Sequence, residues 1–324
     1  MPARHNKSQD PNRYSGHVPP PAGGTPARTS RLWHWEETQV HLEHVGDPGS
    51  AVRLLLVHGA GGNAAAMWPF ASHLARQGFY VTVPDLPGYG ATQSKKPGQV
   101  RYSHWRRLLA DLVRREEDGR PLVIMGASIG GMLAYDTAAA TGLASALVVT
   151  CLLDPRDREV RRSLTWHPAL ARLAGPALQL LAGPLANVRV PLPWIANMRQ
   201  IANNKQLVAE VLSDKRGGGG RVSLGWMRSY LESAPRVEPE KFSGPEVLMV
   251  HPGEDRWTPL AASRAFFDRI AAPKALTVLD NCGHFPIEEP GFSQMLTAVT
   301  QLLSRIQPPP GAPATGVGCS RARA

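Results

Sequence analysis

Apolar and polar residues are arranged along this chain in blocks that match strands and helices. Short, mostly apolar runs predict buried strands at Val52–Val57, Phe79–Val83, Leu122–Met125, Ala146–Leu153, Pro245–Val250 and Ala275–Leu279. Helical spacing of apolar residues predicts helices between them, at Met67–Arg76, Tyr102–Glu117, 131–140, Leu260–Ile270 and Gly291–Ile306. Strands that are apolar on both faces are typical of a parallel sheet covered by helices on each side. The alternating segment Gln39–Val45 predicts a further strand near the sheet edge.

Residues 155–243 interrupt this alternation. They contain an Arg-rich opening, Leu-rich helical stretches, scattered prolines and the run Gly217–Gly220. We expect a helical insertion that acts as a cap or lid, because it enters and leaves the core beside a candidate site described below. A second domain with its own function is the alternative. The expected core then consists of residues 32–154 and 244–306.

The two ends of the chain differ in composition from its body. Residues 1–31 and 307–324 are rich in Pro, Gly, Ala and Arg, and we expect both to be disordered tails. The net charge of +10 at first suggests a nucleic-acid partner. Much of that charge lies in the tails, and the body lacks the aromatic and basic pattern of RNA-binding modules. We therefore expect no nucleic-acid partner.

Cysteine usage and motif content narrow the class further. The three cysteines, Cys151, Cys282 and Cys319, form an odd set in a long chain and do not indicate a disulfide framework. Neither Cys-x-x-Cys nor His-Glu-x-x-His occurs, so we expect no metal site, and no motif calls for a cofactor. No run of about 18 apolar residues predicts a membrane-spanning segment. The expected protein is cytoplasmic and reduced.

The most informative stretch is Gly126–Gly130, a Gly-x-Ser-x-Gly pattern between a predicted strand and a predicted helix. In this context Ser128 lies on a sharp turn, and the flanking glycines let the strand and helix approach each other. The serine also lies at a helix N-terminus, where negative charge is stabilised. The alternative interpretation is a glycine-rich turn that happens to contain a serine. A base and an acid elsewhere in the chain would favour the catalytic interpretation.

A serine hydroxyl needs a base that removes its proton, and the base needs an acid that orients it. Asp255 and His284 each follow a predicted strand, in the chain order Ser, Asp, His. The C-terminal ends of parallel strands meet at one sheet edge, where ligands bind. Ser128, Asp255 and His284 are therefore the candidate catalytic residues. Asp154 also follows a core strand and is the alternative acid.

Two further motifs, His58-Gly59-Ala60 and Asp85–Gly90, precede the serine motif. With all four motifs in order, the chain resembles the α/β-hydrolase superfamily over residues 35–306, in its serine-nucleophile branch with a helical cap. The resemblance implies a mostly parallel eight-stranded α/β-hydrolase sheet with helices on both faces. It also implies an oxyanion hole made by the backbone N–H groups of Ile129 and Ala60, with Gly61 as the alternative to Ala60.

A serine nucleophile disfavours the haloalkane dehalogenase and epoxide hydrolase branches, which use a carboxylate. We expect a carboxylic ester hydrolase that acts on a small-molecule ester through an acyl-enzyme. Thioester, lactone, amide and C–C bond hydrolysis and haloperoxidase-like chemistry use the same triad and remain alternatives. A catalytically inactive ligand-binding homologue is the alternative from another class.

The cap offers apolar and aromatic side chains for an acyl pocket. The candidates are Trp166, Trp194, Trp226 and Met227. The same side chains could instead only pack the cap against the core.

Overall fold

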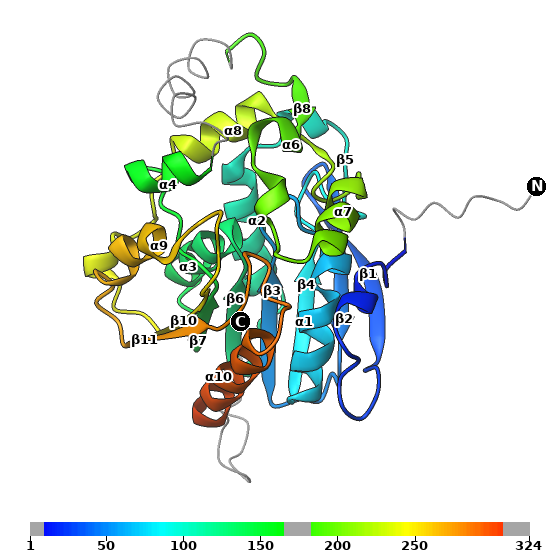
Figure 1. The fold of residues 1–324 in the computed structure, drawn as a ribbon, viewed down its shortest axis with the longest axis vertical. Helices are drawn as coiled ribbons and strands as arrows, with labels where there is room; N and C mark the ends of the chain where they lie inside the picture. Colours follow the sequence, from blue (N-terminus) through cyan, green and yellow to red (C-terminus); the bar gives the residue numbers. More distant parts are fainter. Residues whose placement is uncertain (1–9, 165–182, 307–324) are drawn as a thin grey trace, which may run out of the picture.

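The computed structural model describes residues 10–164 and 183–306 of the chain. Figure 1 shows its central sheet with helices on both faces. Eight strands follow one another in the order β1-β2-β4-β3-β6-β7-β10-β11, and the short strand β5 pairs with β2. All pairings from β4 to β11 are parallel. The predicted mostly parallel α/β sheet is therefore confirmed.

The parallel strands form the buried centre of the sheet. Their bounds are β4 (Phe79–Pro84), β3 (Val52–Val57), β6 (Leu122–Gly126), β7 (Ala146–Val149), β10 (Glu246–Pro252) and β11 (Lys274–Leu279). Every residue of β3, β6 and β7 is buried, as expected for strands covered on both faces. In the edge strand β11 only Leu279 is buried and half of the residues are exposed, which explains why the strand is less uniformly apolar.

Five helices cover the two faces of the sheet. They are α1 (Ala64–Arg76), α2 (Tyr102–Arg115), α3 (Ile129–Thr141), α9 (Leu260–Phe267) and α10 (Gly291–Ile306). On one face, Phe70 of α1 packs edge-on against Phe292 of α10, with ring centroids 5.8 Å apart. On the other face, α2 packs beside α3, and Tyr135 of α3 contacts Phe266 of α9 at 5.2 Å. This arrangement fixes the loops at the C-terminal ends of the strands.

The insertion between β7 and β10 lies over those loops, at the top of Figure 1. We call the described part of residues 155–243 the cap. Its elements are α4 (Arg158–Ser163), β8 (Arg189–Pro191), α6 (Leu192–Ile195), the 3-10 turn η4 (Met198–Gln200), α7 (Lys205–Ser213), β9 (Arg221–Ser223) and α8 (Leu224–Leu231). Strands β8 and β9 form a small antiparallel sheet of their own, which the sequence did not predict.

The N-terminal region corrects one prediction. We expected residues 1–31 to be disordered, but residues 10–31 are folded, with Tyr14 and Val18 buried against the rest of the molecule. Strand β1 (Arg28–Trp35) begins inside the predicted tail and pairs with β2 (Thr38–Val45), so β1 and not β2 is the sheet edge. A few anchoring side chains outweigh the Pro- and Gly-rich composition here. Residues 1–9 and the predicted tail 307–324 lie outside the described residues.

Candidate active site

Ser128 lies in the tight turn between β6 and α3, with backbone angles φ 56° and ψ −129°. A non-glycine residue rarely adopts this conformation, which costs about 1–3 kcal/mol unless its surroundings hold it. The backbone N–H of Ser128 donates to Thr150 Oγ1 at 2.9 Å. A Cβ at Gly126 would lie 2.1 Å from the carbonyl oxygen of Gly130, and one at Gly130 would lie 2.4 Å from that of Val57. Both glycines are therefore required by close backbone approach.

The structure brings the predicted serine, base and acid together in one hydrogen-bonded chain. His284 Nε2 lies 2.8 Å from Ser128 Oγ, and His284 Nδ1 lies 2.8 Å from Asp255 Oδ2. Asp255 follows β10 and His284 follows β11, which are adjacent parallel strands. Both side chains are buried. The imidazole is thus held between an acceptor and the hydroxyl that it can deprotonate.

Asp255 is held as a carboxylate by donors from its own loop. Oδ1 accepts from the backbone N–H groups of Trp257 (2.9 Å) and Thr258 (2.8 Å), and Oδ2 accepts from Thr258 Oγ1 (2.8 Å). Burial alone would raise the pKa of Asp255. The charge of His284 and these hydrogen bonds outweigh burial and lower that pKa below its ordinary value.

Sequence reasoning missed three residues that support the chain of hydrogen bonds. Thr258 Oγ1 bonds Asp255 and also lies 3.0 Å from His284 Nδ1. The ring of Trp257 packs against the imidazole of His284, with centroids 4.8 Å apart. Thr150 holds the backbone of Ser128. Their positions next to a candidate acid, or at the end of the strand beside the serine turn, were the only sequence signals.

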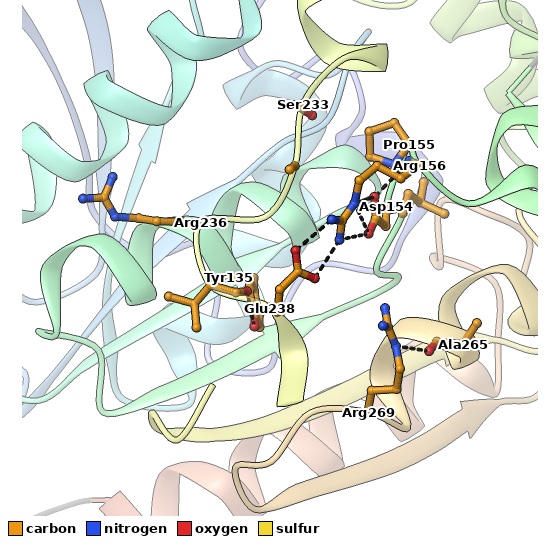
Figure 2. A network of polar contacts seen from close by, with 12 residues as sticks. Tyr135, Asp154, Pro155, Arg156, Ser233, Arg236, Glu238, Ala265 and Arg269 are labelled. Atoms are coloured by element: carbon orange, nitrogen blue, oxygen red, sulfur yellow. Dashed lines mark hydrogen bonds and ion pairs between the residues drawn. The ribbon is translucent and has the colours of Figure 1, made fainter. Parts of the chain in front are cut away.

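Asp154, the alternative acid, belongs to a different network. Its carboxylate accepts from Arg156 Nη2 at 2.8 Å and from Nε at 3.0 Å. The same guanidinium donates to both carboxylate oxygens of Glu238, at 2.7 and 2.9 Å. Figure 2 shows Arg156 between these two carboxylates. In the structure Asp154 therefore pairs with Arg156, while Asp255 occupies the position beside His284.

The glycine-rich loop after β3 lies directly against the serine turn. A Cβ at Gly59 would lie 3.0 Å from Ser128 Cβ and 3.2 Å from the backbone nitrogen of Ile129. Ala60 and Ile129 line the same cavity beside Ser128, and Ala60 also lines a second, smaller cavity together with Gly61. The loop is anchored by His58, whose Nε2 accepts from the N–H of Leu86 at 3.0 Å. Burial lowers the pKa of His58, so its imidazole is neutral and accepts this bond.

An apolar cavity of about 100 Å³ opens beside Ser128. Trp226 and Met227, two of the candidates for an acyl pocket, line it together with Leu164, Leu192, Ile195, Met198, Tyr230, Leu231 and Trp257. Trp194 does not line it, because its side chain is 75% exposed. Leu192 and Ile195 turn the inner face of the short helix α6 toward the cavity, which leaves Trp194 on the outer face. Trp166 lies outside the described residues.

In the ranges 10–164 and 183–306, no three His, Cys, Asp or Glu side chains are grouped so that they could hold a metal ion. Within the same ranges, none of the helices has the length and apolar character needed to cross a bilayer.

Known proteins share parts of this chain. The protein YfhR of Salmonella typhi, described as uncharacterized, is 30% identical over 118 residues. That match covers 34% of this chain and 40% of the length of YfhR. The Salmonella typhimurium protein of the same name matches to the same extent.

Solved structures share the fold. A monoglyceride lipase of Saccharomyces cerevisiae, solved with a substrate analog, superposes with a TM-score of 0.72 at 17% identity and covers 89% of this chain and 98% of its own. A monoacylglycerol lipase of Paleococcus ferrophilus gives 0.66 at 17% identity, over 85% and 99% of the two chains. The model of the alpha/beta hydrolase family matches residues 54–292. With this match over most of its length and the fold described above, the chain belongs to the alpha/beta hydrolase family.

Proposed function

We propose that the protein is a serine hydrolase that cleaves a carboxylic ester through an acyl-enzyme. One observation carries the proposal: the hydrogen-bonded chain from Asp255 through His284 to Ser128, which ends beside an apolar cavity. In this chain, His284 can take a proton from Ser128 while Asp255 stabilises the imidazolium that forms.

The first half of the reaction forms the acyl-enzyme. Ser128 Oγ attacks the carbonyl carbon of the ester as its proton passes to His284 Nε2. The tetrahedral intermediate expels the alcohol, which leaves with that proton. The backbone N–H groups of Ala60 and Ile129 are our proposed donors to the oxyanion, since both residues line the cavity at Ser128. Losing one such donor typically lowers kcat by about 10²–10³.

The second half of the reaction releases the acid. A water molecule gives a proton to His284 and attacks the acyl carbon, and Ser128 regains its proton as the acid leaves. Before attack, the lowered pKa of Asp255 keeps its carboxylate charged at neutral pH. The imidazolium therefore finds a fixed negative charge in both halves of the cycle.

The apolar cavity supports a hydrophobic acyl group as the part of the substrate that the cap covers. Its walls come from both the core and the cap, through Trp257, Trp226 and Met227. Walls of this kind shield an apolar acyl group from bulk water. The two lipase neighbours, named for the hydrolysis of glycerol esters, support an ester rather than an amide.

A panel of nitrophenyl esters and nitrophenyl thioesters of varied acyl length tests the proposal. We expect ester hydrolysis by the full chain, and a loss of more than about 10⁴-fold in kcat for Ser128→Ala. A fluorophosphonate should label the wild type and not Ser128→Ala. Labelling that persists in the variant contradicts the proposal. A consistent preference for thioesters would favour the thioesterase alternative, and ligand binding without any turnover would favour the inactive homologue.

A further inference from the structure

A second cavity of about 40 Å³ lies beside Ser128, next to the glycine-rich loop. The loop Gly59–Gly62, His284 and Phe285 line it from the core, and Ile201 and Val211 line it from the cap. One further wall is Tyr14, which comes from the N-terminal segment. This segment precedes residues 54–292, to which the family model corresponds. The small cavity therefore includes a residue from outside the range that the family model matches.

Tyr14 is held in place by a buried carboxylate. Its hydroxyl donates to Asp214 Oδ2 at 3.0 Å, and Asn63 Nδ2 donates to the same oxygen at 2.9 Å. Asp214 Oδ1 accepts from the backbone N–H of Arg216 at 2.9 Å. Burial and the charge of Asp214 raise the pKa of Tyr14, so the hydroxyl stays protonated and remains a donor. Asp214 thus joins the N-terminal segment, the cap and the end of the glycine-rich loop.

Asn63 connects Asp214 with the glycine-rich loop. Asn63 follows Gly62 in the chain, and its Oδ1 accepts from the N–H of Ala66 in the first turn of α1 at 2.8 Å. Next to Tyr14, Arg13 forms an ion pair with Glu210 of α7. These contacts fix the tyrosine ring, which is only 1% exposed, at the end of the small cavity.

The small cavity, which that ring helps to line, has room for only a small group. A water-sized group needs about 10–15 Å³ of free space, so a cavity of about 40 Å³ takes a group of roughly three heavy atoms. The larger cavity also lies beside Ser128, and apart from Ala60 and Ser128 its lining residues are different ones. A scissile carbonyl has two substituents, the acyl chain and the alkoxy group. Two unequal cavities beside one nucleophile match two unequal substituents.

We propose that Tyr14 is a specificity-determining residue, whose ring closes the small cavity and limits the substrate group that enters it. The substrate class is then an ester with one short substituent and one larger apolar substituent. This inference rests on the proposed ester hydrolysis. It assigns to the N-terminal segment a part in substrate selection that residues 54–292 do not supply.

Two ester series test the inference on the full chain. One varies the acyl group of nitrophenyl esters from acetate to decanoate, and the other varies the alcohol of butyrate esters from methyl to octyl. In Tyr14→Ala we expect kcat/KM for the larger members of one series to rise at least about tenfold relative to its smallest member. The size profile of the other series should stay as in the wild type. Unchanged profiles in both series would overturn the inference.

Two variants separate the loss of the ring from general loosening of the segment. Tyr14→Phe keeps the ring and removes the bond to Asp214, so its size profiles should match the wild type. Val18→Ala removes a buried side chain of the same segment that lines neither cavity, and its profiles should also match. A changed profile in Val18→Ala would assign the effect to the whole segment and contradict a specific role of Tyr14.

A third variant covers a failure to fold. If Tyr14→Ala yields no folded protein, Tyr14→Leu keeps an apolar anchor while it shortens the side chain, and it should widen the same series. An unchanged profile in folded Tyr14→Leu would then count against the inference. Failure of the proposed function looks different, because the wild type would hydrolyse no member of either series or Ser128→Ala would remain active.

Discussion

Ser128 combines a reactive hydroxyl with a backbone conformation that costs free energy. Its φ of 56° and ψ of −129° lie in a region that glycine adopts without a Cβ penalty. Thr150 and the close approach of Gly126 and Gly130 hold the residue there. The strain presents Oγ above the sheet at the point where His284 Nε2 reaches it.

Relief of this strain can be measured. Ser128→Gly should raise the free energy of unfolding by about 1 kcal/mol or more and abolish hydrolysis. Ser128→Ala is the matched control, because it also removes the hydroxyl but keeps the Cβ. Urea unfolding of the two variants gives the comparison. Equal stabilities of Ser128→Gly and Ser128→Ala would show that the turn is not strained.

The two candidate acids have different partners in the structure. Asp255 accepts from His284, while Asp154 binds Arg156. We expect Asp255→Asn to lower kcat for a nitrophenyl ester by about 10⁴, because an amide no longer orients and stabilises the imidazolium. Asp154→Asn should change kcat by less than about tenfold. A large loss in Asp154→Asn with a small one in Asp255→Asn would reverse the assignment.

Among the elements, the central strands and most core helices could be predicted because their signals are local. Strand β3 and helix α10 have the predicted bounds. A mostly apolar run indicates a strand buried on both faces, and apolar residues at helical spacing indicate a helix with one buried face. The order Ser128, Asp255, His284 was equally visible, because each residue follows an apolar strand.

Elements held by distant contacts could not be predicted in this way. Tyr14 is anchored by Asp214, two hundred residues away, and Arg28 at the start of β1 pairs with Glu43. The residues that neighbour Tyr14 and Arg28 in the sequence do not indicate these two contacts. The outward position of Trp194 likewise depends on how the four residues of α6 lie on the cavity.

Strand β2 carries a charged cluster that links pH to the stability of the site. His41 Nδ1 lies 2.8 Å from Asp85 Oδ2, and its Nε2 lies 3.3 Å from Glu43, which also pairs with Arg28. Burial opposes protonation, but the hydrogen bonds that His41 donates to Asp85 and Glu43 raise its pKa to about 9. Asp85 Oδ1 in turn accepts from the N–H of Ala64 at the start of α1.

The raised pKa of His41 determines in which direction the stability of the protein changes with pH. The stabilisation from protonated His41 is fully present below the unfolded pKa of about 6.5 and is lost as the pH rises through about 9. We expect the free energy of unfolding to fall over this interval by at most about 3 kcal/mol. His41→Gln should remove that part of the decline. A decline of the same size in His41→Gln would assign it to other groups.

For the molecule as a whole, the question is how the cap is joined to the core. The chain leaves the core after β7 and returns before β10, and both crossings meet at Arg156. This guanidinium binds Asp154 at the end of the core segment and Glu238 near the end of the insertion, as Figure 2 shows. Both partners raise the pKa of Arg156 further, so its charge is permanent.

Loss of the interaction of Arg156 with Asp154 and Glu238 should loosen the connection of the cap to the core. Arg156→Gln leaves the buried carboxylate of Asp154 without its cation, which typically costs about 1–3 kcal/mol in the free energy of unfolding. Arg228→Gln is the matched control, because its exposed pair with Glu232 at the C-terminal end of α8 is worth about 0.5 kcal/mol at most. Urea unfolding measures both. Limited proteolysis should also cut Arg156→Gln faster within residues 155–243, since a detached cap exposes its backbone. Equal stability and equal cleavage of the two variants would mean that other contacts, such as those of Asp214 with Tyr14 and Asn63, hold the cap in place without Arg156.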